Sequence, residues 1–178
     1  RHNLPRFRGH LAGVRRLEAI AKFANKMGIQ VLTVFAFSTE NWRRPPAEVT
    51  MLMQTLCSVL ENRLTQLMKG NIRLYFIGQR QGVPDYVLKS LDRAMAKTKN
   101  NKGLVLNLAF NYGARTEIVD AVQAIARQVQ TGKMTVEEIS EDTVSQALYT
   151  RDFPDPDLLI RTSGEQRISN FLLWQLSY

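Results

Sequence analysis

Hydrophobic residues follow two alternating periods along the chain. Residues 11–24 place apolar side chains at helical spacing, and Gly28 follows where glycine commonly ends a helix. Residues 29–37 (IQVLTVFAF) are then almost uninterruptedly apolar and rich in β-branched and aromatic types. That composition is typical of a strand buried on both faces. We therefore expect the first helix to lead into a central strand.

The same alternation continues to the end of the chain. Further strands are predicted over residues 72–77, 104–110 and 158–160. Helices are predicted over about 46–69, 84–99, 116–130 and 168–178, with short helices after the capping box at 135–138 and before 149. Strands that alternate with helices of about ten residues or more favour right-handed βαβ units. The expected fold is α/β: one domain over residues 1–178, with a mostly parallel central sheet flanked by helices.

Polar loops follow three of the predicted strands, at residues 38–44, 111–115 and 161–167. Each loop carries arginine together with hydroxyl or amide side chains. Ligands of parallel sheets bind at the carboxyl ends of the strands. These loops therefore predict a site for a phosphate-bearing substrate.

The segment from Arg161 to Ser169 offers the most specific chemistry. Arg161 is expected at a strand end, and Arg167 and Ser169 at the first turn of the last helix. A helix N-terminus presents unpaired N–H groups and a partial positive charge, and a guanidinium can grip two phosphate oxygens. The alternative is that Glu165 and Asp157 neutralise these arginines in surface ion pairs.

The long helix over residues 46–69 has an apolar stripe wider than one sheet contact requires. The stripe includes Leu52, Met53, Leu56 and Leu60. A second apolar face would suit a cavity beside the sheet. On periodicity alone, an ordinary buried or dimer-facing helix is the favoured interpretation.

Charge and composition narrow the class of partner. The chain has 24 Lys and Arg against 16 Asp and Glu, a formal charge of +8, and its first five arginines precede the first acid, Glu18. An anionic ligand near that end is expected, although a solvated basic face explains the charge equally well. Arg6 and His10 lie four residues apart, so they could contact one anion from one helical face. The single cysteine, Cys57, excludes an intrachain disulfide and indicates a reducing compartment.

Three motifs taken together point to a family. Residues 38–45 (STENWRRP), 107–113 (NLAFNYG) and 161–171 (RTSGEQRISNF) closely resemble the cis-prenyltransferases, with the bacterial undecaprenyl diphosphate synthases as the nearest match. The resemblance covers essentially the whole chain, in order. It implies an enzyme that condenses isopentenyl diphosphate units onto an allylic diphosphate such as farnesyl diphosphate, with Mg²⁺. The product would be a long-chain polyprenyl diphosphate, the lipid-carrier precursor for cell-wall synthesis.

The resemblance also assigns roles to individual residues. Arg6 and His10 would hold the allylic diphosphate, and Arg161, Arg167 and Ser169 the isopentenyl diphosphate. Further residues would complete the site: Ser38 and Asn41 as catalytic residues, Trp42 and Arg44 in substrate binding, with Glu48 behind them. The stripe of Leu52, Met53, Leu56 and Leu60 would line the tunnel that receives the growing isoprenoid.

Two departures from the family pattern concern the metal. The family's Asp-Gly-Asn segment, with its catalytic, magnesium-binding Asp, would precede Arg1, and a second magnesium contact would follow Tyr178. The resemblance therefore implies no metal ligand within residues 1–178, and no activity of this stretch by itself. Gln166 stands where many relatives carry His.

The resemblance implies a cytoplasmic homodimer, peripheral at the inner face of the membrane, whose product partitions to the membrane. Two alternatives stay open. A non-catalytic partner subunit of the same fold would be expected to lose the arginines that this chain keeps at 161 and 167. A basic nucleic-acid-binding domain would explain the charge but would not need the wide apolar helix, and salt-dependent binding would reveal it.

Overall fold

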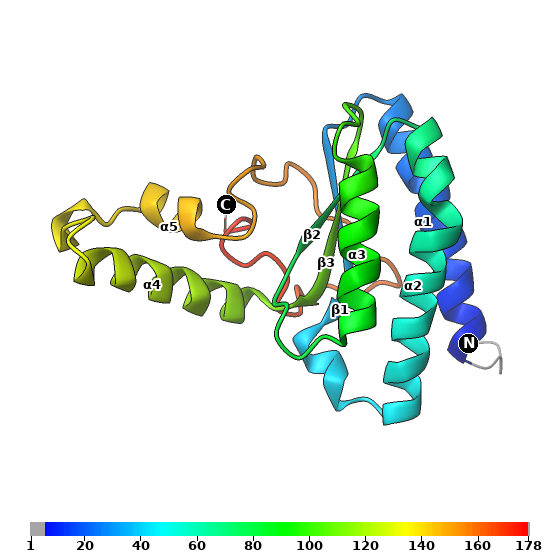
Figure 1. Ribbon diagram of the computed structural model, residues 1–178, viewed down its shortest axis with the longest axis horizontal. Helices are drawn as coiled ribbons and strands as arrows, with labels where there is room; N and C mark the ends of the chain where they lie inside the picture. The colour runs from blue at the N-terminus through cyan, green and yellow to red at the C-terminus, as the bar shows by residue number, and fades with distance from the viewer. Residues whose placement is uncertain (1–5, 178) are drawn as a thin grey trace. The chain divides into compact units, whose positions relative to one another are not determined.

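The computed structural model of the chain describes residues 6–177, excluding the side chains of residues 6–8, 10 and 11. It is an α/β structure whose parallel sheet comprises β1 (Val31–Ser38), β2 (Arg73–Ile77) and β3 (Val105–Tyr112). The strand order is β1-β3-β2 (Figure 1). The expected α/β fold with a parallel sheet flanked by helices is confirmed.

The first strand was expected at the centre of the sheet, and this expectation is wrong. Among the described strands β3 is the middle one and is buried along most of its length, whereas β1 is an outer strand and is mostly half-buried. An apolar run indicates that a segment is buried, but it does not specify which strands lie next to it. Strand order was therefore outside what this run could predict.

Contacts divide the chain into two compact units. The first contains Arg1–Val34, Trp42–Phe76 and Arg80–Leu108, and the second contains Phe35–Asn41, Ile77–Gln79 and Ala109–Tyr178. Each strand contributes residues to both units. The single-domain organisation over residues 1–178 stays a prediction.

In the first unit, helices α1 (Arg6–Lys26), α2 (Pro46–Lys69) and α3 (Asp85–Thr98) accompany the strands (Figure 1). α2 starts at a proline, which suits the first turn of a helix, and ends at Gly70, as the sequence predicts. α2 packs against α3, whose buried face repeats at helical spacing through Val87, Leu91 and Ala94. At the end of α3, the Thr98 hydroxyl accepts a hydrogen bond from the Leu74 N–H of β2 at 3.0 Å.

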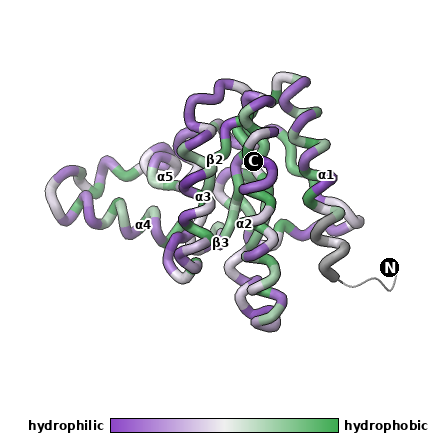
Figure 2. Tube along the Cα trace, turned by 45° about the vertical axis from the view of Figure 1, so that its right-hand side comes forward, coloured by the Kyte–Doolittle hydropathy of each residue, from purple (hydrophilic) through white to green (hydrophobic). Residues whose placement is uncertain are grey.

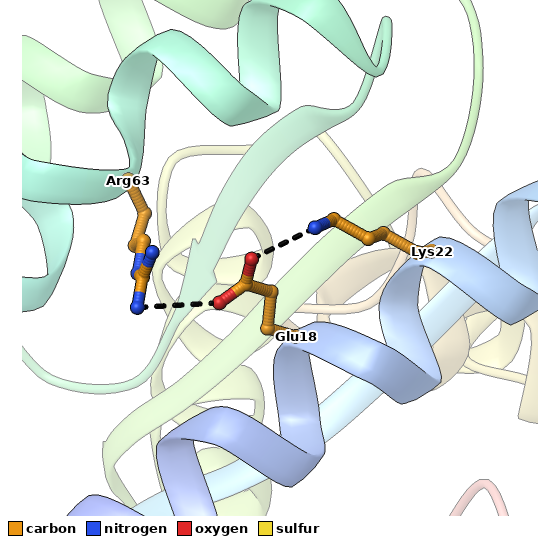
Figure 3. Close-up of polar contacts among 3 residues, drawn as sticks. All are labelled: Glu18, Lys22 and Arg63. Atoms are coloured by element: carbon orange, nitrogen blue, oxygen red, sulfur yellow. Dashed lines mark hydrogen bonds and ion pairs between the residues drawn. The ribbon is translucent and has the colours of Figure 1, made fainter.

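Polar contacts join α1 to its neighbours in this unit. The Glu18 carboxylate contacts Lys22 Nζ at 2.9 Å and Arg63 Nη2 of α2 at 3.4 Å (Figure 3). The hydrogen bond from Lys22, together with the charge of Arg63, holds the pKa of Glu18 below its usual value. Asn25 Nδ2 donates to the Gly70 carbonyl at 2.8 Å, and Asn25 Oδ1 accepts from the Leu104 N–H at 2.9 Å. One amide thereby fixes the end of α1 against the turns that precede β2 and β3.

In the second unit, α4 (Ala114–Gln130) contacts α5 (Glu141–Ala147). Figure 2 shows hydrophobic and hydrophilic residues alternating along α4, as expected for a helix with one buried face. Short 3₁₀ helices are η1 (Thr39–Arg43), where residues 39–41 belong to this unit, and η2 (Val136–Glu138). The capping box predicted at Thr135 and Glu138 is confirmed at the start of η2.

The C-terminal part of the chain departs from the predicted elements. Residues 158–160 form no strand and residues 168–177 no helix within the described region, and the Leu158 and Ile160 side chains are 74% and 75% exposed. Ser169, Asn170 and Leu172 have φ angles of 55°, 62° and 46°. Such left-handed backbone cannot belong to a right-handed helix. Apolar residues of this region, such as Phe171 and Leu172, are buried without forming a helix.

Candidate active site

A tight turn follows β1. The Ser38 backbone N–H donates to Asn41 Oδ1 at 3.1 Å, and both residues are half-buried. This bond stabilises a tight turn at the end of the strand, so the two residues expected to be catalytic lie in one turn. Their roles in a reaction stay a prediction.

Asn170 joins three segments at this end of the sheet. Its carbonyl accepts from the Ala114 N–H and its side-chain Oδ1 from the Arg115 N–H, both at 2.9 Å. Its Nδ2 donates to Glu40 Oε1 at 2.9 Å. The turn after β1, the start of α4 after β3 and the C-terminal segment therefore meet here, as the polar loops of the sequence predict.

The geometry of this junction affects the pKa of Glu40 and restricts the space at Gly113. Partial burial disfavours the charged form of Glu40, yet hydrogen bonds, first that from Asn170, hold its pKa below the usual value. Gly113 makes the close approach possible, because a Cβ there would lie 2.7 Å from both Asn170 Nδ2 and Thr39 Oγ1. Sequence reasoning assigned no role to Asn170. The available signal was its place in the 161–171 motif, since Asn tolerates left-handed backbone.

Arg161, Arg167 and Ser169 also come together in the second unit. Arg161 Nη1 donates to Ser169 Oγ at 2.7 Å and to the Arg167 carbonyl. The three residues lie on an irregular, exposed segment, so the expected helix N-terminus is not part of this cluster. Its cationic character comes from the guanidinium groups alone.

Arg167 forms one of the surface ion pairs that the sequence suggested as the alternative to a phosphate site. Arg167 Nη1 forms an ion pair with Glu165 Oε2 at 3.1 Å, with side chains 69% and 41% exposed. An exposed pair of this kind contributes about 0–1 kcal/mol. A doubly charged phosphate group would bind a guanidinium more strongly, so the pair is compatible with an exchange of Glu165 for a diphosphate.

The remaining site residues belong to the first unit. Arg44 Nη1 contacts Glu48 Oε1 at 2.6 Å, which places the pair at the first turn of α2, and Trp42 is half-buried. Arg6 and His10 are within α1, but their side chains lie outside the described part of the structure. Their expected contact with one anion stays a prediction.

The predicted tunnel residues divide by burial along α2. Met53 and Leu60 are 1% and 4% exposed, whereas Leu52 and Leu56 are half-buried. A helix packed on one side only leaves its other apolar face partly accessible. The arrangement suits a helix with one core face and one free apolar face, and the tunnel itself stays a prediction.

The resemblance implies Mg²⁺, and the described side chains do not supply a site for it. Among them, no group of three or more His, Cys, Asp or Glu residues is placed to hold a metal ion. We therefore assign no metal ligand among the described residues. Cys57 is half-buried, and burial raises the pKa of its thiol, as expected for a thiol in apolar surroundings.

Comparison with known proteins establishes the family. The family model described as "Putative undecaprenyl diphosphate synthase" matches residues 1–178. An isoprenyl transferase of Bacillus anthracis is 48% identical over 178 residues, which are 100% of this chain and 69% of that protein. An isoprenyl transferase of Clostridium perfringens is 46% identical over 178 residues, again 100% of this chain and 70% of the relative.

Solved structures agree with the sequence relatives. A lavandulyl diphosphate synthase from Lavandula x intermedia, in complex with dimethylallyl diphosphate, matches with a TM-score of 0.91 and 38% identity over 94% of this chain and 73% of that one. A probable undecaprenyl diphosphate synthase from Campylobacter jejuni matches with a TM-score of 0.80 and 38% identity over 94% of this chain and 77% of that one.

The α/β fold with its arginine-bearing strand-end loops is that of a prenyl transferase, an enzyme that moves prenyl groups. The chain belongs to the undecaprenyl diphosphate synthase family. Across the described residues, no helix has the length and apolar character needed to cross a membrane.

Proposed function

We propose that this enzyme condenses isopentenyl diphosphate with an allylic diphosphate, farnesyl diphosphate in the first instance, and repeats the step with cis geometry. The product would be a polyprenyl diphosphate, specifically undecaprenyl diphosphate, the precursor of the lipid carrier in cell-wall synthesis. Family membership supports the reaction class. The lavandulyl diphosphate synthase of similar fold binds dimethylallyl diphosphate, which supports an allylic diphosphate as one substrate.

The contact of Arg161 with Ser169 and the Arg167 backbone is the observation that carries this proposal. It joins the Arg161 guanidinium, the Ser169 hydroxyl and the Arg167 backbone on one exposed segment that also carries the Arg167 guanidinium. Asn170, the next residue, fastens that segment to the ends of β1 and β3. Preorganised donors of this type bind diphosphate oxygens through charge-assisted hydrogen bonds. We assign Arg161, Arg167 and Ser169 to isopentenyl diphosphate.

The other residues receive complementary roles. Arg6 and His10 would hold the allylic diphosphate, whose bond to the allylic carbon breaks as the new carbon–carbon bond forms. Arg44 and Trp42 would assist binding, and Ser38 and Asn41 would orient the reacting groups, because catalysis of a condensation depends on alignment. Each condensation releases one diphosphate, so cationic side chains that stabilise the departing charge lower the barrier.

The accessory features follow from the same chemistry. Leu52, Met53, Leu56 and Leu60 would line the tunnel for the growing chain. We also propose a homodimer in the cytoplasm, peripheral at the inner face of the membrane, that uses Mg²⁺ and whose product partitions to the membrane. The half-buried state of Leu52 and Leu56 supports the tunnel.

The test separates the two substrates kinetically. Replacing Arg161 or Arg167 with Ala in the full-length enzyme removes a charge-assisted contact worth roughly 1.5–3 kcal/mol, so KM for isopentenyl diphosphate should rise by about tenfold to a hundredfold. KM for the allylic diphosphate should change little. Arg127→Ala is the matched control, since Arg127 lies in the last turn of α4. Equal effects on both substrates would overturn the assignment.

A further inference from the structure

Glu117 of α4 is a deeply buried acid that the proposed reaction does not use. Its side chain is 1% exposed. The titratable groups that face it are the phenols of Tyr112 and Tyr149 and the carboxylate of Asp120, and none of these supplies a positive charge. A buried carboxylate without a cation is costly unless hydrogen bonds compensate it. The arrangement of its donors therefore calls for an explanation.

The donors come from three separate parts of the chain. Glu117 Oε2 accepts from the Tyr112 hydroxyl at 2.5 Å, at the end of β3, and from Gln175 Nε2 at 3.3 Å. Glu117 Oε1 accepts from the Tyr149 backbone N–H at 2.8 Å. Gln175 Nε2 also donates to Thr150 Oγ1 at 2.8 Å. One carboxylate thus holds residues 149–150 and residue 175 to the same point on α4.

These two attachment points enclose the segment that carries the diphosphate-binding cluster. Residues 151–174 form no helix or strand in the described structure, and residues 157–169 are all exposed. Arg161, Arg167 and Ser169 lie within this exposed stretch. A segment without a backbone ladder or buried side chains depends on its attachments for a defined position. Residues 157–169 are such a stretch, whereas Phe171 and Leu172 after it are buried. Asn170 attaches the end next to Ser169 directly, and Glu117 holds residues 149–150 and residue 175 outside the stretch on either side.

We propose that Glu117 is a positioning residue that clamps both ends of the segment 151–174 and thereby places Arg161, Arg167 and Ser169 for isopentenyl diphosphate. It contacts no substrate and acts through the segment. The inference rests on the proposed function of those three residues. It adds a specificity-determining position inside α4, remote in sequence from the motif that it serves.

The protonation states of the cluster fit this role. Burial, together with the neighbouring carboxylates, raises the pKa of Tyr112 and of Tyr149, so both phenols keep their protons and stay donors near neutral pH. Burial also raises the pKa of Glu117, against the effect of its hydrogen bonds. Only the ionised carboxylate offers acceptors alone. Protonation of Glu117 would turn one of these acceptor oxygens into a donor and weaken the clamp.

The first experiment uses Glu117→Gln in the full-length enzyme, which keeps the shape and replaces one acceptor oxygen with an amide donor. KM for isopentenyl diphosphate should rise about tenfold, the effect of losing one charge-assisted hydrogen bond. KM for the allylic diphosphate and kcat should stay within about twofold. The unfolding midpoint should be unchanged or higher, because the buried charge is gone. Glu137→Gln, an exposed acid of the same unit, is the control and should change none of these values.

A pH profile and an exchange variant separate positioning from packing. The wild-type KM for isopentenyl diphosphate should rise toward acidic pH more steeply than that of Glu117→Gln, since substrate ionisation affects both proteins equally. In Glu117→Gln with Gln175→Glu, the carboxylate moves across the same contact, where it can accept from the amide introduced at position 117 and from the Thr150 hydroxyl. This double exchange should recover most of the lost affinity.

Two outcomes overturn the clamp. One is an unchanged KM for isopentenyl diphosphate in Glu117→Gln, and the other is an equal rise for both substrates. If Glu117→Gln does not fold, Gln175→Leu, which removes only the C-terminal contact with Glu117, must show the same selective rise or the inference is wrong. If Arg161→Ala and Arg167→Ala also leave KM unchanged, the proposed function fails with it. If those two variants lose affinity and Glu117→Gln does not, only the clamp fails.

Discussion

Two glycines near the strand ends are required for different physical reasons. Gly78 follows β2 with a φ of +131°, and a Cβ there would lie 2.1 Å from the Phe110 carbonyl oxygen. Gly113 has an extended φ of −157°, so any residue could adopt its backbone conformation. At Gly113 the constraint is space, because side-chain atoms of Thr39 and Asn170 occupy the position of a Cβ. The constraint at Gly78 is the stricter one, because the backbone atoms of Phe110 cannot move aside as the side chains near Gly113 can.

Alanine substitutions should rank these constraints. Gly82→Ala, with a φ of +80° and no atom within 4 Å of a Cβ, should cost only the strain of left-handed backbone, about 1–2 kcal/mol. Gly78→Ala should cost clearly more, since it adds a collision with a carbonyl to the same kind of strain. Denaturant unfolding measures both free energies. Equal losses for the two variants would contradict the close approach at Gly78.

At the scale of the element, α2 combines a core face with a partly free face. Leu60 is buried, so Leu60→Ala should lower the free energy of unfolding by about 2–5 kcal/mol, as core truncations do. Leu52→Trp and Leu56→Trp add bulk on half-buried positions. They should fold almost normally and shorten the polyprenyl product, because the growing chain meets an obstruction.

Thermal melting and chromatography of the products read out this α2 experiment. A tryptophan scan of residues 51–64 in the full-length enzyme extends it to both faces. If every variant either unfolds or makes products of unchanged length, α2 is an ordinary core helix and the tunnel lies elsewhere.

At the scale of the whole molecule, stability and positioning place opposite demands on Glu117. Burial raises its pKa in the folded protein. The folded state therefore binds this proton more tightly than the unfolded state does, and the resulting stability is present in acid and is lost as pH rises through the folded pKa. The ionised form, which the converging donors favour, lowers the stability of the protein and fixes its binding segment.

Glu117→Gln should therefore stabilise the protein increasingly with pH. The difference in melting temperature between the variant and the wild type should be small in acid and should grow as pH rises through the raised pKa of Glu117. Glu18 and Glu40, whose pKa values are lowered, act in the opposite direction, since their contribution is lost as the solution becomes acidic. They are present in both proteins and cancel in the difference. A difference that does not vary with pH would contradict a raised pKa for Glu117.

The sequence determined the features that depend on neighbours along the chain. The bounds of α2, with prolines at its start and Gly70 after its end, follow from local backbone preferences, and the strands β1, β2 and β3 follow from apolar runs. The three motifs determined the family, and the polar types after β1 and β3 predicted the junction that Asn170 completes.

Only the tertiary structure decided how these pieces meet. The sequence of β1 is typical of a central strand, but β1 is an outer strand among those that the structure describes, because strand order depends on pairing between distant segments. Residues 168–177 have helical spacing but not a helical backbone, since the Asn170 carbonyl accepts from the start of α4, in a left-handed conformation that a helix excludes. The donors of Glu117 come from residues 112, 149 and 175, so no local pattern could assemble them. Their convergence follows from the fold, because hydrogen bonds between distant segments form only where packing brings the segments together.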